Sequence, residues 1–469
     1  MSAMFDLFAR RAGDIAWSPV MLALLLGSGV WFTFRTGFIQ VTRVREVLRA
    51  TVGSLFGGRR QKNAAGPNIT PFQAVSTALA GTMGVGNITG IAAAITLGGP
   101  GAVFWMWVSA FFGMATKYAE VLLAVRFRRK TSRGGHLGGP MYYIEEGLHC
   151  RPLAVLFCLL CAAASFGIGN MAQTNAVAGA AEASFGLPPW ATGAAMTLAA
   201  ALVILGGVTR VGRVAELLIP ALSVLYILAS ALILLLRFER IPEAFRSIFS
   251  GAFGAAPVLG GAAGYTLSQA VRYGVSRGIF SNEAGLGSSP IAYAASDSSD
   301  AAGQGMWGIF EVFVDTMLVC TLTTLVILTS GAADEGYTGA GMSAQAFSLV
   351  LGPWGGRFIA LALGFFALAS LLGWAVYGER CLEYLFPGGV FSKRLYRLLY
   401  LGAAFLGSVM RLEAVWNLSD LFNALMAVPN LLAVLALSDM VAAATEEYFG
   451  ARRPAAKRNK RRGKKLRQE

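Results

Sequence analysis

The chain of 469 residues is 55% hydrophobic and only 14% charged, whereas soluble globular proteins carry about 25% charged residues. This composition excludes an ordinary soluble fold and indicates a polytopic membrane protein. The net charge of +14 gathers in loops and in the tail Arg452 to Arg467, and no nucleic-acid recognition fold accompanies it. We therefore expect the basic tail to face anionic membrane lipid, with no nucleic-acid partner.

Eleven membrane-spanning helices are predicted, most with the roughly 20 apolar residues that a bilayer core requires. Their approximate bounds are 17–39, 73–97, 102–126, 153–178, 189–208, 214–236, 262–295, 305–329, 356–386, 395–410 and 416–442. The first apolar run follows no small-residue cleavage site, so we interpret it as a membrane helix and not as a removed signal peptide.

Arginine and lysine predict how these spans are oriented. They gather in the loops after the first, third, fifth and ninth spans and in the tail, which places the N-terminus outside and the C-terminus in the cytoplasm of a plasma (bacterial inner) membrane. The chain then divides into an N-terminal helix with a basic cytoplasmic loop (1–69), a first five-helix repeat (70–237), a second, inverted five-helix repeat (262–442) and a basic cytoplasmic tail (443–469).

Glycines interrupt the second span. The interrupting residues are Gly81, Gly84, Gly86 and Gly90, with Thr82, Asn87 and Thr89 between them. Each glycine costs roughly 1 kcal/mol relative to alanine inside a helix, and a break at membrane depth is tolerated only where protein surrounds it. A glycine-lined helix crossing is the alternative, but the polar neighbours favour a binding site. A dinucleotide-binding loop is excluded because no strand precedes the glycines.

The seventh span repeats this character. Its small and polar residues are Gly274, Ser276, Gly278, Ser281, Asn282, Gly285, Gly287, Ser288 and Ser289. It follows the second span by five helices with opposite predicted direction, and paired interruptions of this kind indicate a transport site. For Glu283 we slightly favour an ion pair with Arg277 or Arg272 over direct contact with a ligand. The two arginines could alternatively gate an outer vestibule.

Five motifs resemble the alanine/glycine:cation symporter family. They are GTMGVGNITGIA (81–92), GGPGAVFWMWVSAFFG (98–113), TKYAE (116–120), GGPMYYIEEGL (138–148) and FSNEAGLGSSPIAYAAS (280–296). The resemblance implies a LeuT-type fold of two inverted five-helix repeats preceded by one extra helix. It also implies sodium-driven uptake, proton-driven in some members, of alanine, glycine or a similar small amino acid.

The same resemblance and the two interruptions together give candidate substrate contacts. They are Thr82, Gly84, Gly86 and Asn87 in the second span, Gln173 and Val177 in the fourth, Gly278, Ile279 and Ser281 in the seventh, and Trp374 in the ninth. In the fourth span the alternative is hydrogen bonding between helices, because Asn170 and Thr174 share the face of Gln173. Trp374 would limit the pocket to a methyl-sized side chain, and its alternative is an indole packed against lipid.

Sodium is the expected coupling ion. By resemblance, the Ser370 hydroxyl would bind it together with carbonyl groups near Thr77 and Ala80, because hard cations prefer oxygen ligands. The histidines and cysteines suggest no metal centre, and Cys158 and Cys161 are interpreted as small apolar residues of a membrane helix. No cofactor is expected.

Other charged residues lie within predicted spans. Lys117 and Glu120 share a helix face and are interpreted as a neutralised structural pair. Glu311 and Asp315 share another face, and Asp315 lies near mid-span, where it could tune a cation site. We predict a secondary active symporter that works by alternating access. A membrane-embedded enzyme is one alternative, but the sequence motifs of enzymes are missing. A channel or a sensor is the other.

Overall fold

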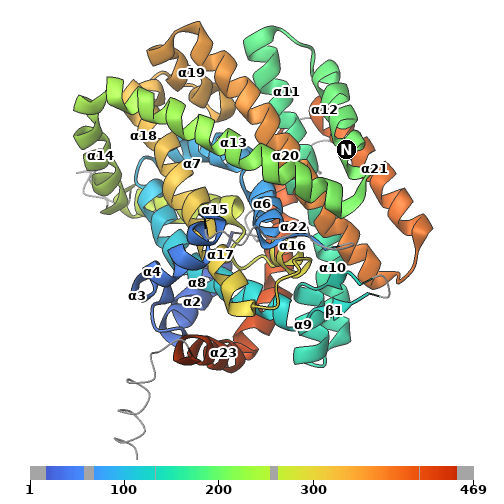
Figure 1. Cartoon of the computed structure of the whole chain (residues 1–469). Helices are drawn as coiled ribbons and strands as arrows, with labels where there is room; N and C mark the ends of the chain where they lie inside the picture. Colours follow the sequence, from blue (N-terminus) through green and yellow to red (C-terminus); the bar gives the residue numbers. More distant parts are fainter. Residues whose placement is uncertain (1–16, 57–67, 132–133, 254–261, 411, 452–469) are drawn as a thin grey trace, which may run out of the picture.

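The computed structural model describes residues 17–56, 68–131, 134–253, 262–410 and 412–451. This part of the chain is nearly all helical (Figure 1), as the composition predicts, with a single antiparallel hairpin between β1 (Arg129–Lys130) and β2 (His136–Leu137). The basic tail Arg452 to Arg467 lies outside the described residues.

The helices before the hairpin contain the first interrupted span. They are α2 (Pro19–Arg35), α3 (Ile39–Thr42), α4 (Val44–Ala50), α5 (Val52–Phe56), α6 (Pro71–Thr82), the 3-10 turn η1 (Val85–Asn87), α7 (Thr89–Gly98) and α8 (Ala102–Arg126). A capping box starts α6: the Gln73 N–H donates to Thr70 Oγ1 at 3.1 Å, and the Thr70 N–H donates to Gln73 Oε1 at 3.0 Å.

The helices after the hairpin include a π-helical bulge and the second interrupted span. They are α9 (Pro140–Gly147), α10 (Arg151–Phe166), the π-helical η2 (Gly167–Met171), α11 (Ala172–Phe185), α12 (Pro189–Ile204), α13 (Gly207–Leu236), η3 (Phe238–Arg240), α14 (Ile241–Phe253), α15 (Ala262–Asn282) and α16 (Pro290–Ala294).

The last third of the described chain contains a second π-helical segment. Its elements are α17 (Ala301–Val312), the π-helical η4 (Phe313–Cys320), α18 (Thr321–Ser330), η5 (Ala332–Asp334), α19 (Gly339–Leu351), α20 (Pro353–Leu385), α21 (Val390–Val409), α22 (Leu412–Ala436) and α23 (Ser438–Ala451). The predicted eleventh span to Ala442 is wrong at its end, because α22 stops at Ala436 and a separate helix starts at Ser438. Helices α14 and α19 lie in segments that the sequence pattern predicted as loops.

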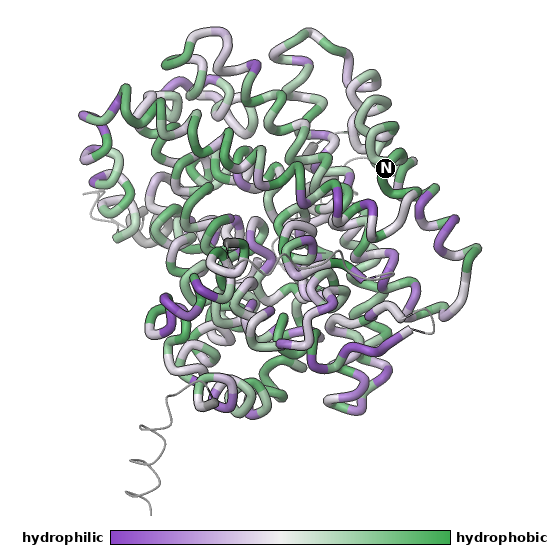
Figure 2. Tube along the Cα trace, in the orientation of Figure 1, coloured by the Kyte–Doolittle hydropathy of each residue, from purple (hydrophilic) through white to green (hydrophobic). Residues whose placement is uncertain are grey.

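Several helices are suited to a lipid environment. Among the described residues, six helices are long and apolar enough to cross a membrane by length and composition: 102–126, 151–185, 207–236, 301–330, 353–385 and 419–436. The total of eleven spans stays a prediction. Along α13, Leu217, Leu228 and Leu235 are 62–78% exposed, and hydrophobic positions cover the long outer helices in Figure 2. Such a face is costly in water and suited to lipid.

Small residues let the interior helices approach closely. Helix α8 packs against both α15 and α17, and Gly305 of α17 lies against the Tyr118 ring of α8. Where α6 crosses α20, a Cβ atom on Gly373 would lie 2.8 Å from the Gly81 nitrogen. These contacts bring the interrupted helix α6–α7 directly against α20.

Candidate functional site

The first break separates α6 from α7. The backbone leaves the α-helix after Thr82 and resumes it at Thr89, with the short turn η1 between. Only Gly84 and Gly86 of the four interrupting glycines lie in this unwound segment. Gly81 is inside α6, where a Cβ atom would meet the Tyr377 hydroxyl at 2.6 Å, and Gly90 is inside α7 with open space around it.

The second break lies between α15 and α16. Glu283, Gly285 and Gly287 have φ angles of +55°, +89° and +81°. These left-handed conformations end α15, and the non-glycine Glu283 adopts one at a strained position of a kind that concentrates at functional sites. The predicted substrate contacts Gly278, Ile279 and Ser281 lie in the last turns of α15, just before this break.

The two breaks touch each other. A Cβ atom on Gly86 would lie 3.5 Å from Ser281 Cα and 3.5 Å from the Phe280 ring. Two segments separated by almost 200 residues therefore meet in the interior, as the sequence predicts for paired interruptions.

One buried carboxylate joins both breaks. Asn87 of the first break donates from Nδ2 to Asp315 Oδ1 at 2.7 Å, and Ser281 donates from Oγ to Asp315 Oδ2 at 2.8 Å. Thr316 donates to the same Oδ2 at 2.7 Å. Asp315 is fully buried in the π-helical η4. The sequence marked Asp315 as a mid-span charge, but it did not indicate this bridging contact.

Side-chain amides hold the backbone of the first break. The Gly84 N–H donates to Asn87 Oδ1 at 3.0 Å, and the Val85 N–H donates to Gln173 Oε1 at 3.0 Å. A Cβ atom on Gly84 would collide with Ser370 Oγ and lie 2.8 Å from Gln173 Oε1. Gln173 therefore lies at the break, whereas Val177, one helical turn further along α11, faces α20 near Gly364.

Trp374, Ser370, Thr77 and Ala80 lie where α20 crosses α6. All four are buried, so the alternative of a lipid-packed Trp374 indole is wrong. The Ser370 hydroxyl lies 3.5 Å from Gly81 O, and a Cβ atom on Gly373 would lie 3.1 Å from Thr77 O. Hydroxyl and carbonyl oxygens of the two helices thus face one another.

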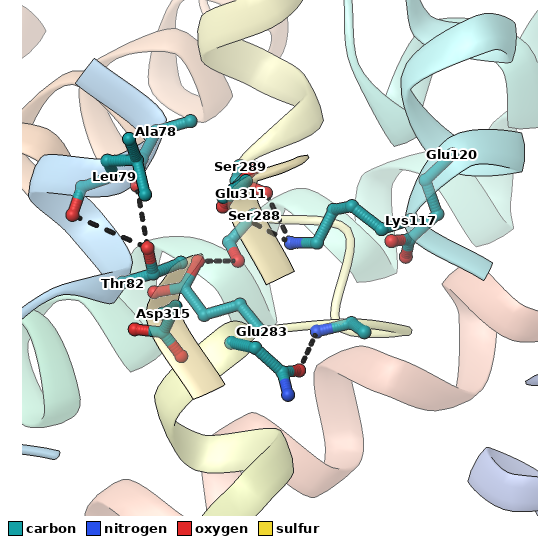
Figure 3. A network of polar contacts seen from close by, with 12 residues as sticks. Ala78, Leu79, Thr82, Lys117, Glu120, Glu283, Ser288, Ser289, Glu311 and Asp315 are labelled. Atoms are coloured by element: carbon teal, nitrogen blue, oxygen red, sulfur yellow. Dashed lines mark hydrogen bonds and ion pairs between the residues drawn. The ribbon is translucent and has the colours of Figure 1, made fainter. Parts of the chain in front are cut away.

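Thr82, a predicted substrate contact, forms only local hydrogen bonds among the described residues. Its hydroxyl donates to Ala78 O and Leu79 O of its own helix (Figure 3).

A charged network surrounds the second break (Figure 3). Lys117 donates from Nζ to Ser289 Oγ at 2.5 Å and lies 3.7 Å from Glu311 Oε1, while Tyr293 donates to Glu311 Oε2 at 2.9 Å. The direct ion pair of Lys117 is thus with Glu311 and not, as the sequence had predicted, with Glu120. Glu120 instead accepts hydrogen bonds from Asn430 Nδ2 at 2.5 Å and from the Gly285 N–H at 3.2 Å.

The predicted pairing of Glu283 with an arginine is also wrong. Glu283 accepts a hydrogen bond from Ser288 Oγ, whereas Arg277 forms an ion pair with Asp420 of α22 at 3.2 Å. Glu283 follows the last residue of α15 in a left-handed conformation, so helical spacing does not place it on the face of Arg277. Arg272 lies over the Tyr273 ring at 5.9 Å.

A cavity of about 610 Å³ lies between the C-terminal part of α20, the β1–β2 hairpin and the start of α13. It runs from charged side chains at the end of α20, including Glu379 and Arg380, to Ala375 and Val376, next to Trp374. Neither Arg277 nor Asp420 lines this cavity, and Asp420 is ten residues, or roughly 15 Å along a helix, before Asn430, which donates to Gly285 O at the second break.

Comparison with known proteins identifies the family. The model of the sodium:alanine symporter family matches residues 2–462. The chain belongs to this family. The sodium/alanine symporter AgcS of Methanococcus maripaludis is 43% identical over 97% of this chain and 99% of its own length. The "Probable sodium/glutamine symporter GlnT" of Bacillus subtilis is 38% identical over 96% of this chain and 91% of its own length.

Solved structures are similar in fold. The manganese transporter of Eremococcus coleocola has a TM-score of 0.50 at 14% identity, covering 83% of this chain and 89% of its own. This likeness shows a LeuT-like transporter fold and nothing about the substrate. Family and fold together make the protein an integral membrane transporter that couples sodium to amino-acid movement, and not an enzyme.

The buried ion pair gives a first prediction, on stability. In Lys117→Met the Glu311 carboxylate loses its cation, and leaving a buried charge unpaired costs about 3–5 kcal/mol. We expect a lower thermal unfolding temperature in detergent for Lys117→Met. The double variant Lys117→Met/Glu311→Gln should recover part of the loss, since the Glu311 charge is removed together with its cation. Equal stability of Lys117→Met and the unaltered protein would contradict the pairing.

The crowding at Gly84 gives a second prediction, on transport. Gly84→Val should abolish sodium-driven amino-acid uptake while the protein still reaches the membrane, because the new side chain collides with Ser370 and Gln173. Gly90→Ala is the matched control, since no atom lies within 4 Å of its Cβ position. Uptake into cells or vesicles, normalised to protein amount, decides the question. Normal uptake by Gly84→Val would show that the first break tolerates a side chain.

Proposed function

We propose that this protein drives the uptake of alanine or glycine with an inward sodium gradient, by alternating access around the two breaks. The observation that supports this most strongly is the meeting of the breaks at Asp315, because this buried carboxylate links the first unwound segment to the last turn of α15, just before the second. A ligand that orders one break is then coupled to the other, which is what reciprocal coupling between sodium and substrate requires.

The amino acid is proposed to bind with its carboxylate at the first break. Its carboxylate would accept hydrogen bonds from the Gly84 and Val85 N–H groups, beside Gly86. It would replace the amide oxygens of Asn87 and Gln173, which accept from these groups in the present structure. Thr82 would line this end of the site. Backbone N–H groups at a helix break suit a negative charge, because they carry the positive end of the helix dipole.

The remaining contacts are proposed to surround the small side chain. Gly278, Ile279 and Ser281 would form the wall on the α15 side, and Val177 the edge on the α11 side. Trp374 would limit the space opposite, which favours glycine and alanine. One methylene in an apolar pocket discriminates by only about 1–3 kcal/mol, so moderate preference for small substrates is expected.

Sodium is proposed to bind between α6 and α20. The ligands would be the Ser370 hydroxyl and the carbonyl groups of Thr77 and Ala80, which provide the oxygens that hard cations prefer. Asp315 is proposed to add negative charge near the ion. The burial of these groups supports the proposal, since a cation there is held away from competing water.

The transport cycle is proposed to rock one set of helices against the other. The Arg277–Asp420 pair is proposed to close one side of the site and the 610 Å³ cavity to open the other, where Glu379 and Glu383 form ion pairs with Arg397 and Lys393 of α21. With the proposed orientation, N-terminus outside and C-terminus cytoplasmic, this is an inward-facing arrangement of two inverted five-helix repeats (70–237 and 262–442) after one extra helix.

Transport by purified protein in proteoliposomes tests the function. Labelled alanine and glycine should accumulate above their external concentrations when sodium is high outside and low inside, and glutamine should compete weakly. A potassium gradient of the same size is the control. Equilibration without accumulation would indicate a channel, and strong preference for glutamine would overturn the proposed substrate.

The proposed sodium site gives a further prediction. Ser370→Ala should raise the sodium concentration for half-maximal alanine uptake, because one oxygen ligand is lost, while maximal uptake at saturating sodium changes less. Ser392→Ala, at the start of α21, is a matched control whose hydroxyl bonds only to Gly389 O among the described residues. A sodium curve that is unshifted in Ser370→Ala would move the cation site elsewhere.

A further inference from the structure

We propose that the π-helical bulge η2 sets the size selectivity of the transporter, with Gly169 as the residue that positions Trp374. This inference rests on the proposed function, since it assigns the origin of selectivity within that same site. The bulge consists of Gly167, Ile168, Gly169, Asn170 and Met171, between α10 and α11. π-bulges of a single turn occur frequently at functional sites, because they re-aim side chains within a continuous helix.

The bulge is fixed to two neighbouring helices by a buried tyrosine. The Tyr400 hydroxyl of α21 lies 3.0 Å from Gly169 O and 2.9 Å from Leu371 O of α20. Asn170 donates from Nδ2 to Tyr400 O at 2.6 Å. Tyr400 therefore fixes the bulge against α20, one turn before Trp374.

Gly169 provides the surface against which the indole rests. A Cβ atom built on Gly169 would lie only 2.1 Å from the Cβ and Cγ atoms of Trp374 and 2.6 Å from its Cδ2 atom. These atoms are at the root of the side chain, so the indole cannot avoid an added methyl group by rotating its far end. The position of Trp374 thus depends on the missing side chain at 169.

The same bulge reaches the first break. Gln173 donates from Nε2 to Ile168 O at 2.9 Å and accepts from the Val85 N–H at 3.0 Å. The bulge therefore positions both the amide that holds the proposed carboxylate site and the indole that limits the side chain. The Trp374 indole also lies within electrostatic reach of Glu283 at the second break, although its buried Nε1–H makes no hydrogen bond among the described residues.

This order of contacts predicts how the preference between alanine and glycine changes when Gly169 gains a side chain. Because the indole lies between the bulge and the second break, a methyl group on Gly169 should push Trp374 toward the break and reduce the space for the substrate side chain. Alanine should lose more than glycine, which has no side chain. A purely structural defect would lower the uptake of both amino acids by the same factor.

Gly169→Ala and Gly179→Ala form the matched pair for the test. Gly179 lies in α11 with no atom within 4 Å of its Cβ position. Initial rates of sodium-driven uptake give kcat/KM for alanine and for glycine. We expect the alanine-to-glycine ratio to fall about tenfold or more in Gly169→Ala, the order of discrimination that one methylene gives, and to stay unchanged in Gly179→Ala. An unchanged ratio in an active Gly169→Ala overturns the inference.

A second variant covers the outcome in which Gly169→Ala does not fold. Tyr400→Phe removes the hydroxyl that joins the bulge to α20 without adding bulk, so leucine and methionine should compete more strongly with alanine. Tyr118→Phe, which removes a buried hydroxyl bonded to Thr445, should leave competition unchanged. Unchanged competition in Tyr400→Phe overturns the inference. Failure of the unaltered protein to accumulate alanine would instead overturn the proposed function.

Discussion

The structure depends on the hydrogen bonds that a single buried carboxylate accepts from both interrupted helices. Asp315 accepts from Asn87 at one break and from Ser281 at the other, and all three residues are buried. A carboxylate in this environment is costly unless its charge is compensated, and the three hydrogen bonds from Asn87, Ser281 and Thr316 supply part of that compensation. The position of Asp315 couples two segments that are far apart in sequence, because a change in the geometry of one break changes the hydrogen bonds of the other.

The second constraint is the close approach of helices at positions where glycine leaves room for a neighbouring residue. Gly84 lies between Ser370 and Gln173, Gly373 lies against Gly81, and Gly169 lies against Trp374. In each case the missing Cβ atom brings a polar group or an aromatic ring to the backbone of an interrupted or bulged helix. Glycine thus has two separate uses in this chain, since Gly285 and Gly287 supply left-handed turns that end α15.

Local composition predicted the bounds of α8 and the positions of the two helix breaks. Helix α8 has the predicted bounds, Ala102–Arg126, because an apolar run between glycine and charged residues marks both ends. The interruptions of α6–α7 and α15–α16 were predicted from glycines and polar residues within apolar segments. The family assignment came from the motifs and is confirmed by the family match.

Long-range partners could not be predicted in this way. Lys117 pairs with Glu311 on a helix 194 positions later rather than with Glu120 one turn away, and Arg277 pairs with Asp420 rather than with Glu283. Spacing along one helix gives the shared face but not the facing helix. The π-helical segments η2 and η4 were missed for a related reason, because one extra residue in an apolar helix leaves its hydrophobic pattern nearly unchanged.

The most direct test of the central role of Asp315 is the sodium dependence of alanine binding. Labelled alanine is bound to purified protein at increasing sodium, for the unaltered chain and for Asp315→Asn, which keeps the shape of the side chain. Sodium should strengthen alanine binding by about 5- to 150-fold in the unaltered protein, the usual range of coupling between sites, and by far less in Asp315→Asn. Equal strengthening in both proteins would contradict the account that the two breaks are coupled through this carboxylate.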